Sequence, residues 1–179
     1  MRFLVTKIAA IFAFTWRPRV LTGPAKVIDG DTIVVAEELV RLHGIDAPEL
    51  DQTFWWRDRC LSCGTMALAA LEALTAGVSV RCEVVERDRH GRLVAKCFCP
   101  NGVDIGRRLV LAGWALAYRR YSMDYVDAEN EARRARRGIW RGRFVKPWEW
   151  RMSGRQPPTA AGGPSRDASN KRDVSPRRA

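Results

Sequence analysis

Residues 25–45 read AKVIDGDTIVVAEELVRLHGI, and this stretch decides the fold. It holds three short apolar runs rich in β-branched residues, at 25–28, 32–36 and 39–45, and such runs are typical of strands. A turn, Asp29-Gly30-Asp31, separates the first two runs, and Glu37-Glu38 forms a tight connection before the third. The stretch therefore predicts a β-meander.

Later segments predict three helices, because their apolar residues recur at helical spacing between capping residues. They are 62–76, with Ser62 as N-cap and Gly77 after its end, 104–112, with Asp104 and Gly113 in these roles, and 122–137, followed by Gly138. A short strand at 114–118 fits between the last two helices.

A hairpin is expected at 78–99, where β-branched residues return on both sides of the turn 88–91. If Asp88 faces Gly91 across this turn, Cys82 faces Cys97. The two cysteines are then either buried thiols or, in an oxidising compartment, a disulfide. The order of elements predicts an α+β fold, a closed five-stranded OB-fold β-barrel with about three packed helices.

The length and net charge of the chain limit its possible domain organisation and partners. A chain of 179 residues suits one domain with tails, and a net charge of +11 attracts polyanions such as nucleic acid. We expect a folded domain at 24–150 and a disordered basic tail at 151–179, which either holds substrate or only aids solubility. Cys60 and Cys63 form a C-x-x-C without a second ligand pair, which argues against zinc.

Residues 1–23 place basic residues ahead of a short apolar run, as an export signal or an anchor does. The run is too short for an ordinary membrane-spanning helix of about 20 residues, so no stable membrane span is expected. Export to the periplasm or the medium is the prediction, with a cytoplasmic location as the alternative.

Carboxylates and arginines gather at two turns. In the first, Asp29 and Asp31 flank Gly30, a pattern that turn chemistry alone explains. The second is Arg41-Leu42-His43-Gly44-Ile45-Asp46-Ala47-Pro48-Glu49, in which a strand arginine precedes a proline turn bracketed by two carboxylates. Together the two turns favour carboxylates that project away from the core toward a shared cation.

In these features the sequence resembles the staphylococcal nuclease family. That family combines an Asp-rich turn, a strand arginine, a D-[TS]-P-E-like turn and a later D-x-Y-G-R-like hairpin, here Asp88-Arg89-His90-Gly91-Arg92. The resemblance runs from about Lys26 to about Trp148. Four dispersed motifs in the same order are far more specific than any one of them.

The resemblance implies a role for each site residue. Asp31, Asp46 and the main-chain carbonyl of Ala47 would hold calcium (Ca²⁺), a hard cation suited to oxygen ligands. Arg41 and Arg92 would bind the scissile phosphate, and Glu49 would orient the attacking water. Tyr118 would contact a base or sugar of the substrate, unless it only packs in the core.

The implied activity is calcium-dependent hydrolysis of single-stranded or frayed DNA and RNA by a monomer, leaving 3′-phosphate ends. Two alternatives remain open at this point. One is an OB-type module that binds nucleic acid without cutting it, with Arg41 in an ordinary surface ion pair. The other is a surface or exopolysaccharide role, as in a rhizobial relative associated with succinoglycan biosynthesis.

Overall fold

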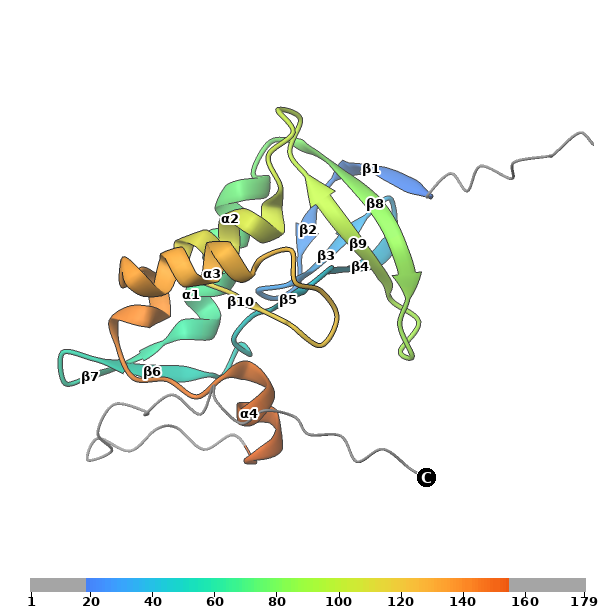
Figure 1. The fold of residues 1–179 in the computed structure, drawn as a ribbon. Coiled ribbons are helices and arrows are strands. Elements are labelled where there is room, and N and C mark those ends of the chain that lie inside the picture. Colours follow the sequence, from blue (N-terminus) through green and yellow to red (C-terminus); the bar gives the residue numbers. More distant parts are fainter. Residues whose placement is uncertain (1–18, 155–179) are drawn as a thin grey trace, which may run out of the picture.

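The computed structural model describes residues 19–154, which form a mixed α+β domain (Figure 1). Its largest sheet has six strands in the order β1-β8-β9-β4-β3-β2 and curls around an apolar core. These strands are β1 (Val20–Pro24), β2 (Lys26–Val27), β3 (Thr32–Val35), β4 (Glu38–Leu42), β8 (Ser79–Arg87) and β9 (Leu93–Phe98). Helices α1 (Cys63–Thr75), α2 (Ile105–Ala112) and α3 (Val126–Arg134) gather on one side of the sheet.

The predicted meander is present, with its second turn one residue earlier than expected. β3 pairs with β2 and with β4, in both cases antiparallel. Ala36 and Glu37 make the turn between β3 and β4, and their φ angles are 49° and 65°. Two successive positive φ angles are the mark of a type I′ turn, whose twist matches that of paired strands. Glu38, expected in the turn, is therefore the first residue of β4.

The strand count differs from the five of the predicted OB-fold barrel. β1 adds an edge strand antiparallel to β8, and β4 pairs with β9 in parallel. The expected strand at 39–45 is divided because Gly44, with a φ of 72°, turns the chain after Leu42. Its last part, β5 (Ile45–Asp46), pairs instead with β10 (Leu116–Ala117) in a small second sheet.

The hairpin of β8 and β9 places Cys82 opposite Cys97, as predicted, but through a different register at its turn. The N–H of Asp88 donates to the carbonyl of Arg92 at 2.9 Å, so the loop is one residue longer than expected. A bulge between Val84 and Glu86 shifts the register back and restores the predicted pairing. Both cysteines are free thiols, with their sulfurs 2.8 Å apart.

Two helices begin as the capping residues predict. Ser62 accepts the N–H of Thr65 at 3.3 Å at the start of α1, and Asp104 accepts the N–H of Arg107 at 2.9 Å at the start of α2. Gly113, with a φ of 77°, ends α2. Both caps satisfy main-chain donors that a helix start leaves without a partner.

The third helix is shorter than the expected 122–137. The hydroxyl of Ser122 accepts the N–H of Asp124 at 3.1 Å, a local bond that competes with helix formation, and α3 begins at Val126. At the other end, Arg136 adopts a φ of 49°, which breaks the helical path before Gly138. A 3₁₀ turn, η1 (Gly138–Arg141), follows.

Besides β1 and η1, two further elements were not expected from the sequence. One is the hairpin of β6 (Thr53–Trp56) and β7 (Arg59–Ser62), which is joined by a tight turn at Arg57 and Asp58. The other is α4 (Pro147–Met152), which carries the domain beyond its expected end at residue 150. Proline at the first helical position is pre-organised for a helix start.

Both chain ends of the domain therefore differ from the expected boundaries. β1 lies partly within the predicted N-terminal segment 1–23, and α4 takes two residues from the predicted tail 151–179. The predicted export signal and most of the predicted tail fall on residues 1–18 and 155–179, outside the described residues. Within the described part of the chain, none of the helices has the length and apolar character needed to cross a membrane.

Candidate active site

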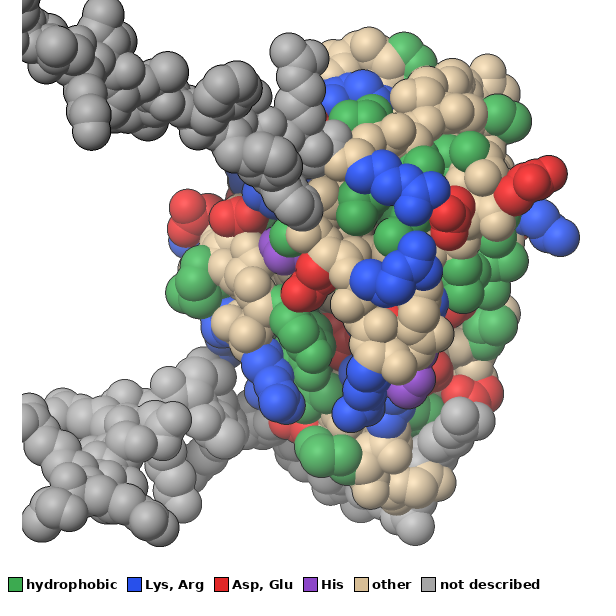
Figure 2. All heavy atoms as spheres, turned by 90° about the vertical axis from the view of Figure 1, so that its right-hand side faces the viewer, with side chains coloured by type: hydrophobic (Ala, Val, Ile, Leu, Met, Phe, Trp, Pro, Cys, Tyr) green, Lys and Arg blue, Asp and Glu red, His purple; other side chains and the backbone are tan. Residues whose placement is uncertain are grey.

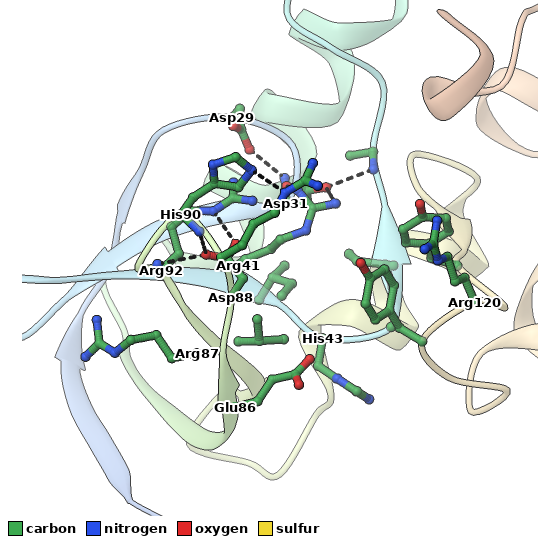
Figure 3. Close-up of a pocket in the computed structure, with 18 of the residues that line it drawn as sticks. Asp29, Asp31, Arg41, His43, Glu86, Arg87, Asp88, His90, Arg92 and Arg120 are labelled. Carbon is green, nitrogen blue, oxygen red and sulfur yellow. Dashed lines mark hydrogen bonds and ion pairs between the residues drawn. The ribbon is translucent and has the colours of Figure 1, made fainter. Parts of the chain in front are cut away.

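A cleft of about 590 Å³ opens among β4, the tip of the β8–β9 hairpin, the loop after β10 and helix α4. Six of the seven predicted site residues line it: Asp31, Ala47, Arg41, Glu49, Arg92 and Tyr118. The seventh, Asp46, is fully buried but bonds to arginines that line the cleft. Figure 3 shows Asp31, Arg41, Asp88 and Arg92 grouped together, with Arg120 across the cleft from them. The structure thus brings all seven predicted residues to one place.

Asp31 is held by the turn between β2 and β3, which packs tightly against the domain. A Cβ added at Gly30 would lie 2.7 Å from the Cβ of Ala47 and 2.9 Å from that of Ala67 in α1, so only glycine allows this approach. The carboxylate of Asp31 accepts the hydroxyl of Thr32 at 3.0 Å and the N–H of Ala47 at 3.2 Å. Burial raises the pKa of Asp31 to about 7, although Arg41 acts in the opposite direction.

Arg41 joins the two buried aspartates. It projects from β4 so that its Nη2 atom lies 3.1 Å from Oδ2 of Asp31 and 2.8 Å from Oδ1 of Asp46. Burial acts to lower the pKa of this guanidinium, but the two carboxylates outweigh it and raise the pKa. Arg41 therefore stays charged, and its side chain is 20% exposed, which leaves part of it open to the cleft.

Glu49 is placed by contacts behind the turn 46–49. A Cβ added at Gly64, in the first turn of α1, would lie 1.8 Å from the carbonyl oxygen of Glu49, so the helix start and this turn are in direct contact. The fully buried Gln52 accepts the N–H of Glu49 at 3.2 Å and donates to the carbonyl of Val145 at 2.6 Å. Gln52 thereby connects this turn to the segment that leads into α4.

Arg92 reaches the cleft from the tip of the β8–β9 hairpin. Its Nε donates to Oδ2 of Asp88 at 2.8 Å, while the main-chain N–H groups of Arg92 and His90 donate to Oδ1 at 3.0 and 2.9 Å. These bonds lower the pKa of Asp88, although its slight burial acts in the opposite direction. Since Asp88 engages only Nε, it fixes the direction of Arg92 and leaves the forked end of the guanidinium for an anion.

Arg151 is a site residue that the sequence analysis missed, because it assigned this residue to the tail. From α4, its Nη2 contacts Oδ2 of Asp46 at 2.7 Å and its Nη1 contacts Oε1 of Glu49 at 2.6 Å. Burial acts to lower the pKa of Arg151, but hydrogen bonds to Asp46 and Glu49 raise it above its ordinary range. The signal available in the sequence was local: Pro147 at a helix start, with basic Arg151 in the last turn.

Aromatic side chains form one side of the cleft. The Tyr118 ring stacks on Trp148 of α4, with centroids 5.5 Å apart and planes 17° apart, and lies 5.0 Å from the Tyr121 ring. Tyr121 is 58% exposed. Trp148 acts here as a packing residue, while the two tyrosines present ring surface at the cleft.

Basic side chains on the outer surface are mixed with acidic ones. The face in Figure 2 carries several separate groups of Lys and Arg with Asp and Glu between them. Ion pairs such as Lys96 with Asp124, at 2.6 Å, have this mixed character. The cleft is therefore distinguished from the rest of this surface by how its charged side chains are arranged, more than by the overall charge of the protein.

The donor set at the cleft suits a hard cation. Carboxylate oxygens of Asp31 and Asp46 lie 3.1 and 2.8 Å from the same nitrogen atom of Arg41, so the two carboxylates face one point. Ala47 donates its N–H to Asp31, which places its peptide beside them. Within residues 19–154, no three His, Cys, Asp or Glu side chains form a ready ligand cluster, so main-chain oxygens and water would complete the shell.

Two arginines that face a cleft beside paired carboxylates form a site suited to a phosphodiester and a hard cation. The chain belongs to the staphylococcal nuclease family, since residues 39–142, more than half of its length, match the family described as Staphylococcal nuclease homologue.

Individual relatives agree with this assignment. An uncharacterized endonuclease of Escherichia coli is 35% identical over 70% of this chain and 81% of its own length. The succinoglycan biosynthesis protein ExoI of Rhizobium meliloti is 40% identical over 68% of this chain and 65% of its own length. A probable staphylococcal-like nuclease of Oryza sativa is 33% identical over 70% of this chain, but the match covers only 32% of the rice protein.

Proposed function

We propose that this protein is a calcium-dependent nuclease that hydrolyses phosphodiester bonds of DNA, RNA or both and leaves 3′-phosphate ends. The observation that carries the proposal is the convergence of Asp31, Arg41, Asp46, Glu49 and Arg92 on one cleft. Family membership and a relative named as an endonuclease support the same reaction class.

Arg41 and Arg92 would bind the phosphate from two sides. Arg41 is fixed by buried carboxylates, and Arg92 is directed by Asp88, so both donors are oriented before substrate arrives. Planar guanidinium groups can each donate two hydrogen bonds to phosphate oxygens, whose charge grows as the water attacks. Removal of one such donor commonly lowers the rate by about 10²–10³-fold.

Glu49 would orient the attacking water and take its proton. Its carboxylate is 32% exposed at the cleft, while its main chain is held by Gln52 and by the start of α1. A fixed backbone with a partly exposed carboxylate suits a group that must position one water molecule. Asp31, Asp46 and the Ala47 carbonyl would hold calcium, which supplies positive charge to polarise the phosphate.

Tyr118 and Tyr121 would receive the bases of a single strand. Base stacking on an aromatic ring is worth about 1–3 kcal/mol and tolerates any sequence. A duplex keeps its bases paired and stacked, so single-stranded or frayed substrates are the expected preference. The rhizobial relative's name links that protein to succinoglycan biosynthesis, and an exopolysaccharide-associated role would leave the chemistry proposed for this cleft unchanged.

The test is degradation of single-stranded DNA and RNA by the purified full chain, with calcium or with a chelator. Glu49→Gln and Arg92→Ala should each lower the rate by about 10²-fold or more. Arg81→Ala is the matched control, because Arg81 lies on the same hairpin, pairs with Glu83 and does not line the cleft. Mass spectrometry of the products should find phosphate at the 3′ end.

Substrate that is bound but left intact across metal and pH conditions would reject the enzyme and favour a binding module. Cutting that persists at full rate in the chelator would reject calcium dependence alone. Equal rates for wild type and the Arg92→Ala variant would reject the proposed phosphate site.

A further inference from the structure

The contact of Arg151 with the acidic side of the cleft has a consequence for cation binding. Nη2 of Arg151 contacts Oδ2 of Asp46 at 2.7 Å, and its Nη1 lies 3.2 Å from Oδ1 of the same residue. Oδ1 also accepts Arg41 at 2.8 Å. Asp46 is fully buried, so Arg41 and Arg151 provide its charge neutralisation.

We propose that Arg151 is a tethered cation that occupies the metal-binding side of Asp46, and that a divalent cation must displace its guanidinium to bind. This inference rests on the calcium site of the proposed function. A cation bound directly at Oδ2 of Asp46 would lie against the Arg151 guanidinium, and the two positive charges would repel one another at that short distance.

Glu49 is drawn into the same exchange. Nη1 of Arg151 contacts Oε1 of Glu49 at 2.6 Å, so the guanidinium engages one oxygen of the carboxylate assigned to the attacking water. Departure of Arg151 would free that oxygen at the moment the cation binds. Cation binding and release of Glu49 are therefore one coupled event.

The side chain can leave while its helix stays in place. Trp150 is 3% exposed, and Trp148 stacks on Tyr118, so α4 is anchored by two residues that directly precede Arg151. The side chain of Arg151 is 36% exposed, and its long stem allows the charged end to swing into solvent. No movement of the main chain is required.

Calcium binding measured by isothermal titration calorimetry, without nucleic acid, tests the exchange. Arg151→Ala and Arg151→Gln should each bind calcium about tenfold more tightly than wild type, because neither offers a competing charge. Arg151→Lys keeps the charge but loses the forked contact, so its calcium affinity should lie between that of wild type and that of the two neutral variants. Lys146→Ala is the matched control, since it removes one positive charge from the N-cap of the same helix, where Lys146 pairs with Glu149.

A second readout follows the guanidinium itself. The Nε–Hε resonance of Arg151, assigned by its loss in Arg151→Lys, should shift on calcium addition, while the same titration of Asp46→Asn should leave it in place. This measurement needs no comparison of stabilities between variants.

The outcomes separate this inference from the proposed function. If wild type binds calcium, and the Arg151 variants bind it equally or more weakly, the exchange is overturned and the calcium site stands. If neither wild type nor any Arg151 variant binds calcium, both the calcium site and the exchange are overturned. Tighter binding in both neutral variants, with Lys146→Ala unchanged, supports the exchange.

Discussion

The two sides of the cleft are built in different ways. The acidic side belongs to the core: Asp46 is fully buried, Asp31 is 5% exposed, and the turn that carries Glu49 touches the first turn of α1. The arginine side is a hairpin tip, where Arg92 is held by a single residue, Asp88, four positions earlier. Changes on the acidic side should therefore affect folding and catalysis together, whereas changes at the hairpin tip should affect catalysis alone.

The largest expected effect is on the acidic side, at Gly64. Alanine there would bring a Cβ to 1.8 Å from the carbonyl oxygen of Glu49, a main-chain atom that cannot move without shifting the turn. We expect Gly64→Ala to lower the free energy of unfolding by about 3–4 kcal/mol, or to prevent folding. Chemical denaturation followed by tryptophan fluorescence measures this.

Gly23→Ala is the matched control for this substitution, because the nearest atom to the added Cβ would be 3.8 Å away. It should change stability by no more than about 1 kcal/mol. Equal effects of the two alanines would show that the start of α1 does not hold the Glu49 turn.

The next effect isolates the hairpin side. Arg92→Ala should lower activity by about 10²–10³-fold yet cost less than about 1 kcal/mol of stability, because its ion pair with Asp88 is partly exposed. Arg41→Ala should lower both the activity and the stability, since it leaves buried Asp31 without its charged partner. Paired rate and denaturation measurements distinguish them; a large stability loss in Arg92→Ala would contradict the contrast.

The two sides should also differ in their response to pH. The raised pKa of Asp31, about 7, means that the folded state binds more protons than the unfolded state between about pH 4 and pH 7. Without calcium, stability should therefore fall by about 1–2 kcal/mol as the pH rises from about 5 to above 7. Asp88 has a lowered pKa, so its contribution is lost only at still lower pH.

Asp31→Asn provides the control for this pH dependence, because it cannot titrate. Its unfolding free energy, measured in a chelator, should be flatter over the same range. A wild-type profile that rises with pH in this window would be the opposite of the expected sign.

The smallest expected effect concerns the aromatic side. Tyr118→Ala should raise the Michaelis constant for single-stranded substrates by about tenfold, with little change in the maximal rate, because stacking aids binding more than chemistry. Tyr118→Phe should behave as wild type if the ring face is what matters. An unchanged constant in Tyr118→Ala would assign this residue to packing on Trp148 alone.

Sequence reasoning succeeded where the determining contacts are local. Ser62 and Asp104 cap helices through N–H groups three residues away, and Gly113 ends α2 by its own conformation. It failed at the β6–β7 hairpin because Arg57 and Asp58 adopt positive φ without glycine or asparagine to signal a turn.

The same distinction explains the site. Asp31, Arg41, Asp46 and Glu49 were identified because they lie within 19 residues of each other in family motifs. Arg151 was missed because its partner Asp46 is 105 residues away along the chain, and no local pattern encodes that contact. The sequence also did not indicate β1, because this edge strand depends on pairing with β8, about 60 residues further along the chain.

The burial of the cysteine pair determines when its oxidation state can be set. Cys82 and Cys97 are 0% and 1% exposed, so once the domain has folded a dissolved oxidant or reductant has no access to either sulfur. A disulfide bond between them would close a loop of about 15 residues, and such a bond contributes about 3 kcal/mol of stability. Molecules that fold with and without this bond would not interconvert while folded. The oxidation state of the pair would therefore reflect the redox conditions under which each chain folded.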